Sequence, residues 1–364
     1  QYVVLCTSST KKALRKIPTP ENVKIVIIPK KTRFSSALVT LKHIVPLRFL
    51  LFHQLNAMEK ISRKHNIDLI WFVDGWTHDA CDTPYVATVW DLQHRTHPWF
   101  PEVSSQGTWE YREMTHSRFL KRASHIITGT QVGKQQLGWF YQIPDDQISI
   151  IPHPLPLMNY KVQQEIITNS VFENAEFLKK PFFFYPAQFW AHKNHVNLLH
   201  ALKVLMDNYS HDVNLVFTGS DKGNLPHIIS VANKLGIQKN VFALGFVSTE
   251  QLVFLYRHAI ALTYVSFSGP ENLPPLEAFS LNCPVINADF PGAKEQLGEA
   301  ALYVNPYSPE NIADQMHQVI RDKKMRMELI EKGKDQLKEK GADKFIKKVF
   351  AIFDNFEPIR RTWG

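Results

Sequence analysis

The sequence contains few cysteines, and none in an arrangement that suggests a disulfide framework or a metal site. Its 364 residues include only Cys6, Cys81 and Cys283, which lie far apart in the chain. Disulfide-rich domains and cysteine-based metal centres need paired or closely spaced cysteines, so both classes are excluded. Such sparse cysteine is typical of a reducing compartment, and we expect a cytoplasmic protein.

Several motifs are also absent. No run of 18 apolar residues occurs, so no segment is expected to span a bilayer. The glycine fingerprint of dinucleotide-binding domains and the P-loop are both missing, which disfavours those classes. The GxSxG elbow of α/β-hydrolases is missing too.

The charge is moderately positive. Lysine and arginine number 42 and acids number 34, which gives a formal net charge of +8. This excess favours an anionic partner, either a phosphate-bearing ligand, an acidic membrane surface or nucleic acid. No nucleic-acid-binding signature accompanies the charge, so we expect no nucleic-acid partner.

Short apolar runs alternate with amphipathic segments, a pattern typical of an α/β fold with parallel sheets. Strands are predicted over 2–6, 23–28, 69–73, 85–89, 125–129, 148–151, 182–185, 214–218, 241–244, 259–264, 284–288 and 302–304. Helices are predicted over 41–64, 109–123, 131–141, 195–207, 225–236, 249–257, 274–281, 309–321 and beyond 323. We predict two doubly wound domains over 1–155 and 179–341, a linker over 156–178, and a C-terminal helix at 342–364 that packs back on the first domain. Ligands of such folds bind beyond the carboxyl ends of the strands, so the cleft between the domains is the expected site.

The loop after the strand at 182–185 carries Lys193 just before a helix. A cation beside a helix N-terminus favours phosphate. The alternative is an ordinary loop with Asn194 as N-cap and a solvated lysine. The turn at Gly219, after the next strand, lets a ligand approach closely, although a glycine in an ordinary turn also explains it.

Segment 266–279, which reads SFSGPENLPPLEAF, is the most unusual in the chain. Pro274 and Pro275 fit the first turn of a helix, where no N–H is missed. We expect Glu277 within that turn and Glu271 just before it. Both acids either face a ligand or only stabilise the helix dipole.

Segment 88–101 follows a strand and gathers an acid, histidines and tryptophans. Aromatic side chains with polar neighbours suit sugars, and they suit packing equally well. Asp91 and His94 are the candidate polar groups, with His94 or His97 in acid/base or hydrogen-bonding roles.

In order and spacing, these segments resemble the retaining glycosyltransferases of family 4, the group 1 class with the GT-B fold of two Rossmann-like domains facing a central cleft. The resemblance is strong over 180–322 and looser over 65–155. It rests on the helix at 273–279 with the strand at 283–286, on the loop 182–195, on Leu244–Val247, and on 301–306.

The resemblance implies a residue set. Glu277 would bind the ribose of a nucleotide-sugar, Lys193 its diphosphate, and backbone amides near Asn272 and Leu273 its oxygens. Asp91 would face the transferred sugar or the acceptor. The implied catalytic residues are Asp91, His94, Lys193 and Glu271. The implied donor-binding residues are Gln188, Lys193, Gly219, Phe246, Val247, Gly269, Asn272, Leu273, Pro274 and Glu277.

The chain departs from the family pattern at three places. Gly269 stands where the family has a glutamate, Gln188 where it has an arginine, and Trp90 where it has a histidine. The family also implies a reaction without metal or other cofactor, a UDP-, GDP- or dTDP-sugar donor, and a glycan or lipid-linked acceptor in surface polysaccharide synthesis. The alternatives are a non-catalytic nucleotide-sugar binder, and an epimerase or phosphorylase on this fold.

Two further expectations concern the N-terminal half. The basic amphipathic segment 41–64 suggests peripheral attachment to an anionic membrane, and a buried domain helix is the alternative. The loop 7–12 lacks the glycines that the family has in its first βα unit, so we expect several tens of residues before Gln1.

Overall fold

The structure is a computed structural model that describes residues 2–6, 18–27, 57–75, 78, 80–155, 172 and 175–363. The chain divides into two compact units, residues 1–70 with 79–85, and residues 71–78 with 86–364. The first unit contains a parallel pair of strands, β1 (Tyr2–Cys6) and β2 (Val23–Ile27), and helix α4 (Ala57–His65). Only the end of the helix predicted over 41–64 is described. Residues 41–56 and the loop 7–12 lie outside the described residues.

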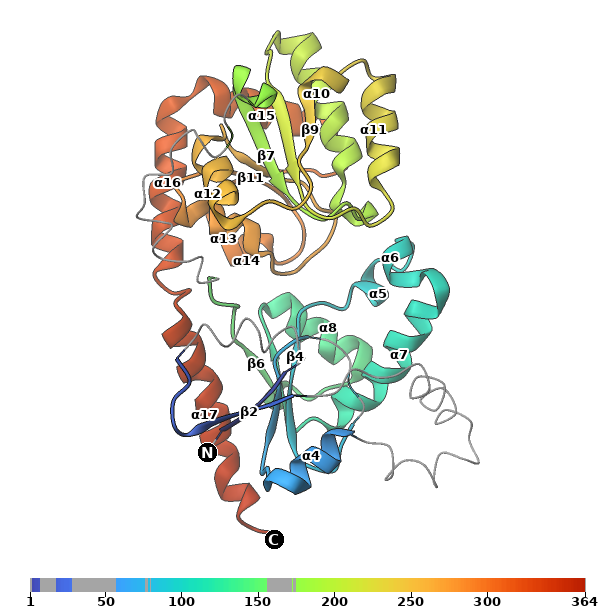
Figure 1. Cartoon of the computed structure of the whole chain (residues 1–364), viewed down its shortest axis with the longest axis vertical. Helices are drawn as coiled ribbons and strands as arrows, with labels where there is room; N and C mark the ends of the chain where they lie inside the picture. Colours follow the sequence, from blue (N-terminus) through green and yellow to red (C-terminus); the bar gives the residue numbers. More distant parts are fainter. Residues whose placement is uncertain are drawn as a thin grey trace. The chain divides into compact units, whose positions relative to one another are not determined.

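The second unit contains a six-stranded parallel sheet (Figure 1) with the order β12-β11-β10-β7-β8-β9. Its strands are β7 (Phe182–Pro186), β8 (Asn214–Thr218), β9 (Val241–Ala243), β10 (Leu262–Tyr264), β11 (Val285–Ala288) and β12 (Ala301–Val304). The first strand is central, and the chain first builds outward on one side and then on the other. This is the doubly wound order, in which the loops after β7 and β10 diverge and leave a crevice at the strand ends.

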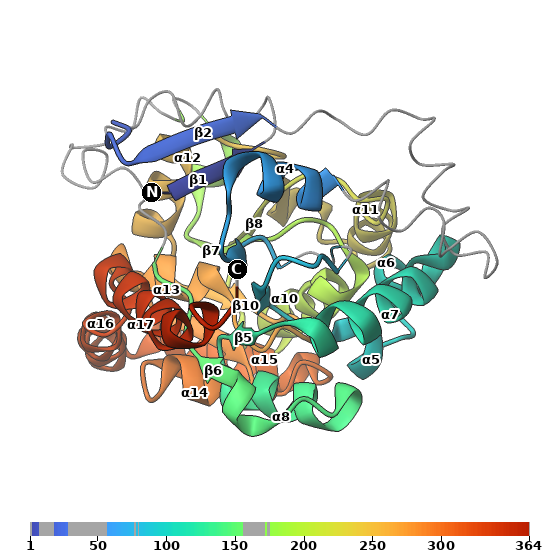
Figure 2. The same ribbon diagram turned by 90° about the horizontal axis from the view of Figure 1, so that it is seen from below.

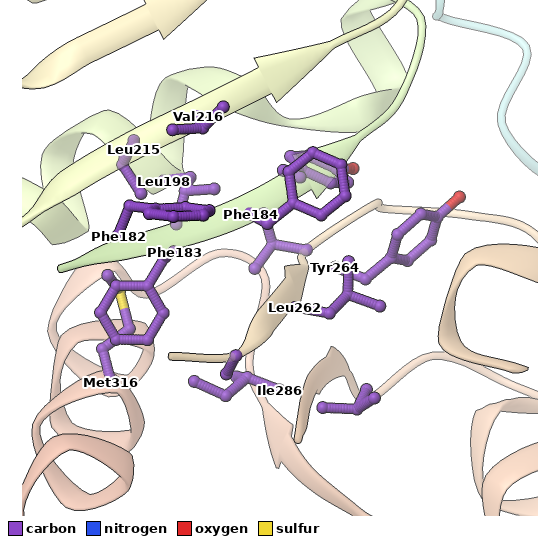
Figure 3. Packing of buried hydrophobic residues seen from close by; sticks show 14 of the residues in the cluster. Phe182, Phe183, Phe184, Leu198, Leu215, Val216, Leu262, Tyr264, Ile286 and Met316 are labelled. Carbon is purple, nitrogen blue, oxygen red and sulfur yellow. The ribbon is translucent and has the colours of Figure 1, made fainter. Parts of the chain in front are cut away.

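The sequence of β7 explains why this sheet is buried on both faces. Phe182, Phe183 and Phe184 are each at most 2% exposed. Alternate residues of a strand point to opposite faces, so three consecutive large apolar residues require cover on both. Phe184 packs against Tyr256 on one face, with ring centroids 5.0 Å apart. Figure 3 shows Phe183 beside Met316 on the other.

Helices connect these strands, and further helices follow the last strand. They are α10 (His195–Tyr209), α11 (Leu225–Lys234), α12 (Thr249–His258), α13 (Leu273–Ser280), α14 (Ala293–Leu297), α15 (Pro309–Arg321), α16 (Lys323–Leu337) and α17 (Ala342–Arg360). The predicted strands and helices of this region are confirmed within a few residues. The exception is the short helix α14, which the periodicity did not predict.

Most of a second sheet belongs to the same unit; its order is β3-β4-β5-β6, and the pairs β4–β5 and β5–β6 are parallel. Its strands are β3 (Ile70–Phe72), β4 (Tyr85–Val89), β5 (His125–Thr128) and β6 (Ile148–Ile150). Its helices are α5 (Gln93–Thr96), α6 (Pro101–Ser104), α7 (Thr108–Phe119) and α8 (Gln131–Tyr141).

Helix α17 runs beside this second sheet (Figure 1 and Figure 2). Phe345 and Phe353 on α17 contact Trp71 of β3, with ring centroids 6.2 and 6.0 Å apart. The predicted linker over 156–178 falls largely on residues outside the described ranges, so the predicted domain boundaries stay a prediction.

Candidate functional site

The crevice between β7 and β10 is occupied by a lysine–tyrosine–asparagine chain. Lys193 lies in a 3-10 turn, η6 (Ala191–Lys193), after β7, and Tyr264 is the last residue of β10. Lys193 Nζ donates a hydrogen bond to Tyr264 Oη over 2.8 Å, and Tyr264 Oη donates to Asn272 Oδ1 over 2.8 Å. The crevice thus holds a cation fixed at the position where doubly wound folds bind ligands.

Lys193 is held without a charge partner. Its main-chain carbonyl accepts a hydrogen bond from buried Tyr185 Oη at 2.7 Å. Its ammonium group lies 5.3 Å from the centroid of the Tyr264 ring. No carboxylate pairs with it in the described part of the chain. Because no described neighbour neutralises the ammonium group, its full positive charge is available to attract a bound anion.

Asn194 does not cap the helix with its side chain, as the alternative interpretation of this loop requires. It occupies the N-cap position of α10, but with φ +60° its side chain makes no capping hydrogen bond. Instead Asn194 Nδ2 donates to the carbonyls of Val265 and Pro306, at 2.9 and 2.8 Å. The side chain therefore ties together the loops after β7, β10 and β12.

The loop before α13 is fixed by the buried side chain of Gln296 on α14. Gln296 Oε1 accepts the Asn272 N–H at 3.0 Å, and Gln296 Nε2 donates to the Asn272 carbonyl at 2.7 Å. The Asn272 N–H is consequently occupied within the protein. Because Pro274 and Pro275 have no N–H, only the Leu273 amide, where α13 begins, fits the implied oxygen-binding role among residues 272–275.

Gly269 has a backbone conformation that excludes a side chain. Its φ is +128°, and a Cβ placed on it would lie 2.7 Å from Asn272 Oδ1. A glutamate at this position, as in the resembled family, would strain the backbone and collide with Asn272. The departure at Gly269 is therefore built into the fold of this loop.

Glu277 lies in the second turn of α13, and the first turn contains no acid. The expectation that it lies in the first turn is wrong, because the helix begins at Leu273. Glu277 Oε2 accepts a hydrogen bond from Tyr256 Oη at 2.7 Å. Burial raises the pKa of Glu277 and outweighs the opposing effect of Tyr256. The helix-dipole alternative for Glu277 is thereby weakened.

Glu271 is inserted into the end of the four-stranded sheet. Its side chain is 4% exposed, and Oε1 accepts the His153 N–H at 2.8 Å. A Cβ on Gly129, just after β5, would lie 1.7 Å from Glu271 Oε2, so only glycine fits there. Burial raises the pKa of Glu271 to about 7, against the opposing effects of the His153 N–H and Lys340.

Two other glutamates make comparable links. Glu102 Oε1 accepts the His192 N–H at 2.9 Å and also contacts the His192 ring, while Glu295 Oε1 accepts the Gln131 N–H at 2.6 Å. Each links a residue that follows a strand of one sheet to a residue that follows a strand of the other. Sequence reasoning missed these contacts because the partners are 90 and 164 residues apart.

Asp91 lies just after β4 and lines a pocket together with loop residues 267–270. Its Oδ1 accepts hydrogen bonds from the Gln93 N–H at 2.8 Å and from Arg112 at 3.1 Å. Burial raises the pKa of Asp91, but the Arg112 charge and the Gln93 N–H outweigh it, so the net shift is downward. Asp91 is therefore ionised at neutral pH.

His94 lies in a buried cluster. It is fully buried, and Nε2 lies 2.9 Å from Tyr141 Oη. Burial, with the nearby Arg112 charge, lowers the pKa of His94 to about 3. This environment favours a packing and positioning role, because a substrate sugar cannot reach the ring without rearrangement.

The remaining donor-binding candidates line the loops after β7, β8 and β9. Gln188 is exposed and accepts a hydrogen bond from Trp190 Nε1 at 2.8 Å. Gly219, with φ +143°, allows close approach to Ala187, and its N–H donates to the Gly245 carbonyl. Phe246 is 92% exposed, and half-buried Val247 follows it. An apolar ring left so open is available for stacking on a planar ligand.

Sequence reasoning missed Tyr264 and Gln296, which hold the crevice together. Tyr264 reads as one more strand residue, and its position at the carboxyl end of β10 was the only available signal. Gln296 lies on the helix that the periodicity did not reveal. No group of three or more histidine, cysteine or acidic side chains in the described ranges could hold a metal ion. No helix among the described residues is long and apolar enough to cross a membrane.

Comparison with known proteins shows which proteins this chain is similar to. Residues 167–336 match the family model described as Glycosyl transferases group 1. The O-antigen chain mannosyltransferase RfbU of Salmonella typhimurium is 28% identical over 187 residues, which cover 51% of this chain and 48% of the relative. The chain thus spans about half the length of this curated relative.

Two solved structures show a similar fold. The Anabaena protein Alr3699/HepE in complex with UDP and glucose has a TM-score of 0.69 at 14% identity, over 97% of this chain and 91% of that chain. WaaG, a glycosyltransferase involved in lipopolysaccharide biosynthesis, has a TM-score of 0.64 at 15% identity, over 93% and 94%. The predicted α/β class and GT-B fold are therefore confirmed. Residues 167–336 are similar to the glycosyl transferases group 1, and the chain has the GT-B fold.

Proposed function

We propose that this protein is a retaining glycosyltransferase of family 4. It moves a hexose-type sugar from a nucleotide-sugar to a glycan or lipid-linked acceptor in surface polysaccharide or lipopolysaccharide synthesis. The observation that carries the proposal is the unneutralised Lys193, fixed by Tyr264 in the crevice of the segment that matches the family. The names of RfbU and WaaG support the acceptor class.

In this proposal the donor lies across the strand ends of the six-stranded sheet. The diphosphate meets Lys193 and the Leu273 N–H, and the Glu277 carboxylate accepts the ribose hydroxyls. The exposed Phe246 ring stacks on the base beside Val247, while Gln188 and Gly219 border the phosphates. Tyr256 and Tyr264 orient Glu277 and Lys193 through hydrogen bonds of 2.7 and 2.8 Å.

Charge explains how these groups would promote transfer. Breaking the bond between the sugar and the diphosphate develops negative charge on the leaving phosphate and positive charge at the anomeric carbon. A cation or hydrogen-bonding N–H group of the protein that is fixed before the reaction stabilises that charge without reorganising. One well-placed group of this kind lowers the barrier by about 3–4 kcal/mol. Lys193 and the Leu273 N–H act on the phosphate side, and we expect no metal to be needed.

One carboxyl group is proposed to face the transferred sugar, and a second to hold the loop beside it. Asp91 is ionised and borders the pocket, where it suits the positive charge that develops at the anomeric carbon. Glu271 is buried, accepts the His153 N–H and does not line the pocket, so we assign it to positioning the loop that carries Gly269 rather than to contact with the sugar. His94 is buried and lies within hydrogen-bond distance of Tyr141 Oη, so it supports this region without touching the sugar.

The acceptor class suggests where the enzyme works. Lipid-linked acceptors present their glycans at a membrane surface, and the net charge of +8 favours an anionic one. We therefore propose a cytoplasmic enzyme that binds peripherally to the inner face of the membrane.

The proposal is tested by incubating the protein with UDP-, GDP- and dTDP-linked glucose or mannose, with and without oligosaccharide acceptors, and following the products by NMR. We expect a new glycosidic bond whose anomeric configuration matches that of the donor. Epimerised donor would indicate an epimerase, and sugar phosphate formed with inorganic phosphate would indicate a phosphorylase. Donor binding without any turnover would leave a non-catalytic binder.

A further inference from the structure

Four aromatic rings from three separate segments form a continuous row beside the Asp91 pocket. Trp99 contacts Phe100, Phe100 stacks on Phe267, and Phe267 contacts Tyr307, with ring centroids 6.2, 5.8 and 4.8 Å apart. His97 contacts both Trp99 and Phe100, at 5.3 and 6.1 Å. We call Trp99, Phe100, Phe267 and Tyr307 the aromatic row.

The two ends of the aromatic row are open to solvent. Trp99 and Tyr307 are each 67% exposed. A single exposed ring needs no explanation. Rings contributed by residues 99–100, 267 and 307 are joined into one strip, and an apolar strip with both ends exposed is typical of a binding surface.

The aromatic row is continuous with the pocket. Phe267 and His97 line it together with Asp91, Gln93 and Gln136. The lining therefore combines ring faces with hydrogen-bonding side chains. A pyranose has the matching surface, because its C–H groups pack on ring faces while its hydroxyls exchange hydrogen bonds with carboxylate and amide groups.

The position of the aromatic row separates it from the proposed base-binding ring. Phe267 follows β10 and Tyr307 follows β12, on one side of the central strand β7. Phe246 follows β9, at the opposite edge of the sheet. The order of the strands thus places the aromatic row and Phe246 on opposite sides of the Lys193 crevice, which leaves the aromatic row free for a second ligand.

We propose that the aromatic row is a subsite for the acceptor glycan. Sugar units that precede the reacting one stack on Trp99 and Tyr307, while Phe267 and His97 border the unit that enters the pocket. This inference rests on the proposed glycosyltransferase function and adds to it a site for a chain of at least two sugars.

The test uses tetrasaccharides as probes on the full chain. Mannotetraose, maltotetraose and cellotetraose are titrated to about 10 mM, with tryptophan fluorescence and saturation-transfer NMR as readouts. The variants are Trp99→Ala and Tyr307→Ala, with Trp99→Phe to keep a ring. Trp139→Ala is the matched control, because Trp139 is 69% exposed and lies on α8. Circular dichroism verifies that each variant is folded.

We expect at least one tetrasaccharide to bind the unaltered protein. The two alanine variants should bind it about fivefold or more weakly, whereas Trp99→Phe and Trp139→Ala should bind nearly as well as the unaltered protein. In transfer assays the KM for the acceptor should rise and the KM for the donor should stay constant. Absence of tetrasaccharide binding, or equal binding by all variants, would overturn the inference.

A separate titration with nucleoside diphosphates distinguishes the two proposals. If nucleotide binds but tetrasaccharide binding ignores Trp99 and Tyr307, the acceptor subsite is wrong and the proposed function stands. If no nucleotide binds, the proposed function itself fails.

Discussion

The loops of the six-stranded sheet and those of the four-stranded sheet differ in how they are held. After β7 and β10, the side chains of Asn194, Tyr264 and Gln296 hold the backbone and Lys193 through internal hydrogen bonds. After β4, the chain instead presents Asp91 to a pocket and leaves Trp99 exposed.

This difference matches two tasks. Stabilising a developing phosphate charge requires groups that are fixed before the reaction, because reorganisation would consume the benefit. Binding an acceptor glycan requires aromatic ring faces that solvent can reach. These rings need not be held as rigidly as the groups that stabilise the phosphate charge. We therefore expect substitutions in the crevice to change rate and donor affinity, and substitutions in the aromatic row to change acceptor affinity.

The largest effect should come from Lys193→Ala. We expect kcat/KM to fall about 10²–10³-fold, because the leaving phosphate loses its fixed cation. Lys203→Ala is the matched control, since Lys203 lies on α10 and pairs with Asp207 at the surface. Steady-state kinetics would count against the assigned role of Lys193 if both variants kept full activity.

Gln296→Ala should have the second-largest effect, which is a loss of stability. The substitution leaves the Asn272 N–H and carbonyl unpaired in a site where Gln296 is 2% exposed. Each unpaired buried group costs about 1–3 kcal/mol, so we expect unfolding free energy to drop by about 2–4 kcal/mol. Urea denaturation measures this, and an unchanged midpoint would show that the loop before α13 does not depend on Gln296.

Glu277→Gln should weaken donor binding and leave stability nearly unchanged. A carboxylate that accepts ribose hydroxyls makes charge-assisted hydrogen bonds worth about 1.5–3 kcal/mol. Glu250→Gln is the control, because Glu250 is an acid in the first turn of α12. Calorimetry giving equal affinities for both variants would contradict the assigned ribose contact.

Glu271 should give the protein a specific dependence of stability on pH. Its pKa is about 7 when folded and 4.5 in the reference state, so the folded protein binds more protons between these values. Stability then falls as pH rises through that window, by about 1–3 kcal/mol.

Glu271→Gln should remove this pH dependence, because a glutamine accepts the His153 N–H without a charge. Urea denaturation from pH 5 to 8 makes the comparison, and at pH 8 the variant should be the more stable protein. Parallel curves for the two proteins would show that Glu271 is not the group responsible.

The sequence allowed the strands of both sheets to be predicted, and it placed Lys193 in the loop after β7, whereas Tyr264 and Gln296 were missed. Periodicity located β7 through its run of phenylalanines, and the motif order pointed to Lys193 and Glu277. These signals are local, because each depends on residues close together in the chain. The predicted place of Glu277 in the first turn of α13 was wrong, because the helix begins at Leu273 and Glu277 therefore lies in the second turn.

The contacts that hold the site together could not be predicted from the sequence. Gln296 pairs with Asn272 across 24 residues, and Glu271 reaches His153 across 118. Such contacts depend on how helices and loops lie on the two sheets, which no local pattern encodes. The burial of His94 has the same origin, because polar residues next to a strand end read as a surface loop until the packing of Tyr141 is known.

The account rests on the claim that the Lys193 crevice binds a nucleoside diphosphate. Calorimetric titration of the full chain with UDP, GDP, dTDP and ADP tests it most directly, with Lys193→Ala measured in parallel. We expect saturable heat with at least one nucleotide, and a loss of affinity of tenfold or more in the variant. No heat with any of the four, or equal affinity in the variant, would contradict the claim.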